Sequence, residues 1–230
     1  MTSTAPQAIR TVKTWDWGVR LFHWLLVASI AAAFLSSEEG SALSPWHVPA
    51  GWVAAILIAF RLVWGFVGGE HARFVNLIRP SRMVGHVKGL FAGRVHASLG
   101  HNPLGGIAVI MLLALVAATT FTGITGGEGG HEVIAYILLT MIALHVVAVV
   151  AMSFLTRDNL IGAMVTGRKK TAHFRNAQDA APPARLAVPL AVLVVAGSAY
   201  AATRIDPLAF VPGAHGEAGE VDEAGEADED

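Results

Sequence analysis

The feature that most constrains this chain is a series of apolar segments, each long enough to cross a lipid bilayer. A helix needs about 20 mainly apolar residues to do so, at a rise of about 1.5 Å per residue. Segments of this kind occupy positions 17–36, 48–67, 104–121, 133–155 and 186–202. The last is shorter and contains Pro189, so it either spans a locally thinned bilayer or lies at the interface. The sequence predicts an all-α integral membrane protein, with a four-helix transmembrane bundle and a fifth, C-terminal transmembrane helix.

Composition agrees with lipid as the solvent for most of the chain. Only 14% of the 230 residues are charged and 54% are hydrophobic, whereas a soluble domain carries about 25% charged residues. There is no cysteine, which excludes disulfides, thiolate-held iron–sulfur clusters and covalently attached c-type haem. The first 15 residues hold no apolar core followed by a small-residue cleavage site, so we expect no cleaved signal peptide.

The distribution of basic residues predicts how the chain crosses the membrane. Lys and Arg are concentrated before the first segment, between the second and third, and between the fourth and fifth. The connections 37–47 and 122–131 contain none. Because short basic loops stay in the cytoplasm, we expect a multi-pass protein with a cytoplasmic N-terminus. The connections without basic residues then face outward, and so does the C-terminus if the fifth segment spans.

This topology divides the chain into five parts. They are a cytoplasmic N-terminal segment (1–16), the four-helix core (17–156), a basic cytoplasmic segment (157–185), the fifth transmembrane helix (186–203) and an acidic tail (204–230). The tail is of low complexity and is expected to be disordered. The loop 68–102 has an apolar pattern that predicts an amphipathic surface helix. The residues that carry this pattern are Met83, Val84, Val87, Leu90 and Phe91.

Four of the ten histidines stand at the ends of, or within, the apolar segments. His23 and His145 lie toward the inner side, and His47 and His131 lie at the outer ends of their helices. His131 and His145 are separated by about 40° around a regular helix and by about 21 Å along it, so one helix can serve two levels. Histidines from facing helices can hold a haem iron. The alternative is that they are ordinary interfacial polar residues, although ionisable groups inside a membrane are usually functional.

Two arginines extend the pattern. Arg61 lies inside the second segment, where a guanidinium needs an anion, and no acidic residue lies in a helix core. A haem propionate would serve, and Arg20, close to His23, could bind a propionate in the same way. The alternative for Arg61 is that its long side chain reaches the cytoplasmic interface.

Several runs of sequence resemble one known family. These runs are WDWGVRLFHWLLV, FRLVWGFVGGEHARF, LGHNPLGG, HEVIAYILLTMIALHVVAV and NLIGAMVTGRKK. Over residues 12–170 the chain is similar to the prokaryotic cytochrome b561 family, which includes the b-type cytochrome subunits of nickel–iron hydrogenases. The resemblance implies a four-helix protein of the bacterial inner (plasma) membrane that holds two haem b groups and exchanges electrons between quinone and a redox partner.

Carried over by position, the resemblance implies that His23 and His145 bind the inner haem iron, and His47 and His131 the outer one. The start of the second helix departs from the family, because WHVPAGW stands where many relatives have a histidine followed by an acidic residue. His101, in the GHNP run, is a candidate contact for a propionate or for quinone. The other histidines are expected to be solvated surface residues.

These observations together predict a di-haem b-type cytochrome that transfers electrons across the membrane between the quinone pool and a periplasmic partner. The partner is either a hydrogenase-like enzyme or a c-type cytochrome, and we expect no nucleic-acid partner. One alternative is a superoxide:quinone oxidoreductase acting at the outer haem. Acidic residues of the outer loops count against an anionic substrate; they are Glu38, Glu39, Glu128 and Glu132. A haem-free transporter is the other alternative, but it would favour carboxylates within the helices.

Overall fold

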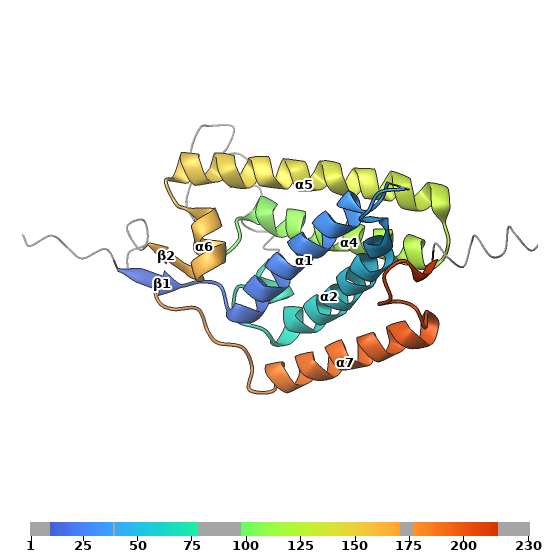
Figure 1. The fold of residues 1–230 in the computed structure, drawn as a ribbon. Helices are drawn as coiled ribbons and strands as arrows, with labels where there is room; N and C mark the ends of the chain where they lie inside the picture. The colour runs from blue at the N-terminus through green and yellow to red at the C-terminus, as the bar shows by residue number, and fades with distance from the viewer. Residues whose placement is uncertain (1–9, 39, 78–97, 171–176, 216–230) are drawn as a thin grey trace, which may run out of the picture. The chain divides into compact units, whose positions relative to one another are not determined.

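The computed structural model describes residues 10–38, 40–77, 98–170 and 177–215, and the fold within these ranges is almost entirely helical (Figure 1). Five helices are long and apolar enough to cross a membrane. They are α1 (Trp17–Leu35), α2 (His47–Val67), α4 (Pro103–Ile124), α5 (Glu128–Thr156) and α7 (Ala187–Ile205). Shorter elements connect them: the 3-10 helices η1 (Ser44–Trp46) and η2 (Phe74–Asn76), helix α6 (Leu160–Thr166), and strands β1 (Thr11–Lys13) and β2 (Arg168–Lys170). The predicted all-α membrane fold is confirmed.

The long helices present large apolar side chains on their outer surfaces. Phe154 of α5 is 79% exposed, and Phe66, Phe121, Val147 and Leu193 are exposed to a similar degree. In water such a surface would be unfavourable, since burial of apolar area is the main force that drives folding. The same surface is suited to contact with lipid chains.

Two regions discussed from the sequence lie outside the described residues. They are the amphipathic segment around Met83–Phe91 and the acidic residues 216–230. By contrast, residues 206–215, which the sequence assigned to the tail, are described and pack in short turns after α7. Helix α5 begins at Glu128, several residues before the predicted segment, so His131 lies in its first turn.

The chain forms two compact units, which are described separately below. Unit 1 comprises residues 1–20, 64–112 and 139–187, and unit 2 comprises residues 21–63, 113–138 and 188–230. Each unit therefore draws on residues that are distant in the sequence.

In unit 1, a two-stranded antiparallel sheet pairs β1 with β2, with Val12 opposite Lys169. Helix α6 precedes β2; the Asn159 side chain accepts a hydrogen bond from the amide of Gly162 at its start. Gly167 ends α6 in the left-handed conformation with φ +78, which a residue without a Cβ adopts at little cost.

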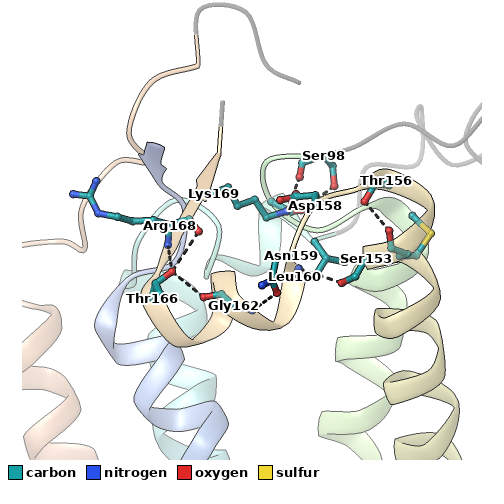
Figure 2. Close-up of polar contacts among 12 residues, drawn as sticks. Ser98, Ser153, Thr156, Asp158, Asn159, Leu160, Gly162, Thr166, Arg168 and Lys169 are labelled. Atoms are coloured by element: carbon teal, nitrogen blue, oxygen red, sulfur yellow. Dashed lines mark hydrogen bonds and ion pairs between the residues drawn. The ribbon is translucent and has the colours of Figure 1, made fainter. Parts of the chain in front are cut away.

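Unit 1 also holds a buried ion pair (Figure 2). The Lys169 ammonium lies 3.0 Å from Asp158 Oδ2, and the two side chains are only 2% and 6% exposed. The ammonium also donates to the carbonyl oxygen of Ser98 at 2.9 Å. Burial lowers the pKa of Lys169, while the hydrogen bond and the charge of Asp158 oppose that shift. The pair thus ties β2 to the end of α5 and to the chain that leads into α4.

The Asp16 carboxylate joins the start of α1 to the end of α2. It accepts hydrogen bonds at 2.9 Å from the Val19 amide, the Trp64 indole and the Gly69 amide. The first of these is a helix N-cap contact. A Cβ built on Gly18 would lie 2.3 Å from the Trp64 ring, so only glycine permits this close approach.

Candidate functional site

The structure brings His47 and His131 together within unit 2. His47 is the first residue of α2 and His131 lies in the first turn of α5. Their ring centres are 6.0 Å apart and the ring planes stand at 84°, so the two imidazoles are not stacked face to face. This is the pair expected from the sequence at the outer level.

Each of the two rings is oriented by a backbone carbonyl. His47 Nδ1 lies 2.9 Å from the Ala33 oxygen of α1, and His131 Nδ1 lies 2.9 Å from the Thr119 oxygen of α4. A carbonyl oxygen only accepts, so Nδ1 carries the proton in each ring. The neutral ring then has its lone pair on Nε2, which is the arrangement found in histidines that ligate a metal.

Local sequence explains why the rings meet. The connection from α4 to α5 is short, and Gly126 adopts φ +72 within it, so the start of α5 lies beside the end of α4. At Gly123 a Cβ would lie 3.1 Å from the His131 ring, so the glycine makes room for the imidazole. Pro49 lies in the first turn of α2, where a proline costs no intrahelical hydrogen bond. The departure from the family pattern is thus compatible with His47 starting this helix.

The donor set fits a haem iron. A metal–imidazole bond is about 2 Å long, so two such bonds plus the distances from each nitrogen to its ring centre amount to about 6 Å. The observed separation of the ring centres matches this sum. Among the described residues, no group of three or more His, Asp or Glu side chains could hold a bare metal ion. Two facing imidazoles suit an iron whose remaining ligands come from a macrocycle.

The two histidines expected at the inner level belong to different units. His23, in α1, is part of unit 2 and packs at 90° to the Trp24 ring, with ring centres 5.0 Å apart. His145, in α5, is part of unit 1 and is partly buried. Their pairing stays a prediction.

Three other residues were expected at the cofactor: Arg61, Arg20 and His101. Arg61 is only 2% exposed, and its guanidinium carbon lies 5.9 Å from the centre of the Phe22 ring, a cation–π contact. Its side chain is therefore buried within the protein. A role at a propionate stays a prediction for all three.

Arg20 and His101 lie in unit 1. The Arg20 guanidinium donates to the carbonyl oxygens of Met164 and Val165 at the end of α6. A positive charge is favourable there, because the C-terminal end of a helix carries the negative end of its dipole. The His101 ring packs edge-on against Trp15, with ring centres 4.7 Å apart. Nothing in the sequence pattern indicated either contact.

Sequence reasoning assigned no role to Asp16, although it lies in the WDWG run. Its position one residue before a helix is the usual N-cap signature, so that part of its role was readable. Its bonds to Trp64 and Gly69 join distant segments, and no local pattern predicts them.

The fold and the site define a class: a multi-pass α-helical membrane protein in which histidines from two helices lie close together. Residues 14–167 match the sequence profile of the family described as prokaryotic cytochrome b561, and the chain belongs to this family. Membership implies a haem b cofactor and a role in membrane electron transfer.

The chain is also similar to two curated proteins. A protein of Azotobacter chroococcum mcd 1, called "Probable Ni/Fe-hydrogenase B-type cytochrome subunit", is 30% identical over 124 residues, which cover 43% of this chain and 52% of that protein. Its counterpart in Azotobacter vinelandii, of the same name, is 29% identical over 124 residues, with the same coverage. The chain spans about half the length of these relatives. No solved structure matches it.

Proposed function

We propose that this chain is a di-haem b-type cytochrome that carries electrons across the inner membrane between the quinone pool and a periplasmic redox partner. The observation that carries the proposal is the geometry of His47 and His131, whose ring centres lie 6.0 Å apart with both Nδ1 atoms held by carbonyl oxygens. When bound, haem b supplies one-electron chemistry at its iron.

The chain's own residues fix the orientation of the ligands in this proposal. The Ala33 and Thr119 carbonyls set the tautomer and the rotation of each imidazole, and a hydrogen-bonded imidazole is a stronger donor to iron. His23 and His145 would hold a second haem at the inner level, and Arg61 would pair with one of its propionates. Two levels along α5 allow electrons to cross the membrane, with the N-terminus in the cytoplasm.

A hydrogenase-like enzyme is the preferred partner. The support is that the two Azotobacter relatives are described as probable b-type cytochrome subunits of Ni/Fe hydrogenases. A c-type cytochrome is the other candidate partner, and quinone is the proposed membrane-side substrate.

Haem content and difference spectra test the outer site. We expect about two haems per purified chain, falling to about one in His47→Ala and in His131→Ala, because each variant leaves the iron one protein ligand short. The same spectral component should disappear from the reduced-minus-oxidised spectrum in both variants. His96→Ala, between α2 and α4 in the sequence, is the control and should keep both components. Two full haem components in His47→Ala would refute the assignment.

A further inference from the structure

The residues that follow α7 return to the start of α2. We call residues 206–215 the C-terminal strap. The family match ends at residue 167, so α7 and the strap are additions to the matched region. The strap, the first part of α2 and the His47–His131 site all belong to unit 2.

Asp206 is the anchor of the strap. Its Oδ2 atom accepts a hydrogen bond from the Trp52 indole at 2.9 Å and lies 3.0 Å from His215 Nε2. Its Oδ1 atom accepts from the Leu208 amide at 2.9 Å. Hydrogen bonds to an ionised carboxylate are stronger than those between neutral groups. One carboxylate thus joins both ends of the strap to a side chain of α2.

Two further contacts hold the strap in place. Ala209 is fully buried in an apolar cluster with Trp52 and Ala202, against which Val48 packs. The Gly213 amide donates to the Pro45 carbonyl at 3.1 Å, where Gly213 has φ +81, a conformation that favours glycine.

These contacts lie on both sides of His47 in the sequence. Pro45 precedes it by two residues and Trp52 follows it by five. Helix ends fray when no tertiary contact holds them, and His47 is the first residue of its helix. Its ring is held by the hydrogen bond from Nδ1 to the Ala33 carbonyl, and the Ala50 carbonyl in the same turn accepts a hydrogen bond from the Ser29 hydroxyl. The position of the His47 backbone depends in addition on what holds Pro45 and Trp52.

We propose that the C-terminal strap is a positioning element for the outer haem: by fixing Pro45 and Trp52, residues 206–215 hold His47 where its Nε2 can ligate the iron. The inference rests on the proposed function of the His47–His131 pair. Without the strap, the first turn of α2 loses its contacts at Pro45 and Trp52, and His47 is held less firmly in the position where it would bind the iron. The contacts described above flank His47 in the sequence, so we expect the effect at the outer haem.

The test compares the two haems within one molecule. In full-length Asp206→Ala and Trp52→Phe, transfer of haem to apomyoglobin is followed for each spectral component, and each midpoint potential is measured by redox titration. We expect the outer component to be lost about tenfold faster, in line with the effect of removing outer-shell support from a metal ligand. Its midpoint potential should also shift, because the axial ligand geometry tunes the iron. The inner component should keep its rate and potential, which also shows that the variants are folded.

Three matched variants sharpen the test. Asp206→Asn keeps a carbonyl acceptor for the Trp52 indole and should restore part of the slow haem loss. Trp46→Phe changes an exposed indole next to the same helix and should behave as wild type. A chain ending at His215 keeps the strap and should also retain the outer haem normally.

The experiments distinguish failure of the strap proposal from failure of the proposed outer haem site. Loss of the outer component in His47→Ala, together with wild-type rates and potentials in Asp206→Ala, would overturn the strap proposal alone. Equal acceleration for both haems would also overturn it, because that indicates general destabilisation. If His47→Ala keeps both components, the outer site itself is wrongly assigned.

Discussion

At the scale of residues, the candidate site depends on polar groups whose orientation is fixed by backbone oxygens. The carbonyls of Ala33 and Thr119 face the Nδ1 atoms of His47 and His131. Both carbonyls lie on helices other than those that carry the histidines. Four helices thus contribute to this pair of histidines, so we expect changes remote in the sequence to affect the pair.

Arg61 supports a prediction at the same scale. Its guanidinium is buried beside Phe22, which precedes His23 in α1. A nearby cation disfavours the oxidised, more positive iron, so Arg61→Leu should lower the midpoint potential of the inner haem and leave the outer one unchanged. Arg61→Lys retains the charge and should stay closer to wild type. A redox titration of both haems checks this, and unchanged potentials in Arg61→Leu would exclude an electrostatic role.

At the scale of elements, unit 1 is held together by polar contacts between short segments. Strands β1 and β2 pair across more than 150 positions of sequence, and Arg20 binds the end of α6. The Asp158–Lys169 pair joins β2 to the end of α5 (Figure 2). These contacts join segments that are distant in the sequence, and the Asp158–Lys169 pair among them is buried.

The ion pair gives a prediction about stability. Lys169→Met leaves the Asp158 carboxylate buried without its cation and should lower the free energy of unfolding by about 3–5 kcal/mol. Replacing both residues, as Lys169→Met with Asp158→Leu, should recover most of that loss, because no charge is then left buried. Thermal unfolding of the detergent-solubilised protein measures both. A double variant no more stable than Lys169→Met would contradict this account.

At the scale of the whole molecule, the chain consists of five candidate membrane helices and a strongly acidic C-terminal sequence. Eight of its 17 acidic residues lie between 216 and 230. Asp206 and His215 belong to the strap and contact each other. A truncation that removes the acidic sequence without disturbing this contact must therefore begin after residue 215.

That truncation tests whether the acidic sequence attracts a basic partner. A chain that ends at His215 should keep both haems and its reactivity with quinone, but should exchange electrons with the partner more slowly. The dependence of this rate on salt should also flatten, since screening within about 10 Å at 0.1 M weakens electrostatic steering. A full-length control with the eight carboxylates changed to amides should behave like the truncation. Identical rates and salt slopes for all three chains would show that these charges are passive.

The sequence alone determined the helices, the family and the candidate ligands. Apolar runs of membrane-spanning length are a local property, and so are histidines at defined depths within them. The five helices agree with the predicted segments to within a few residues, apart from the earlier start of α5.

Only the tertiary structure decided which distant groups meet. The carbonyl partners of the two histidines, the bonds of Asp16 to Trp64 and Gly69, and the return of residues 206–215 to α2 all join positions that no periodic pattern relates. The physical reason is that hydropathy reports the solvent of a segment, whereas a hydrogen bond depends on how packed segments align in space. Asp206 reads in the sequence as one more acid of an acidic tail, and its contact with Trp52 makes it part of the fold.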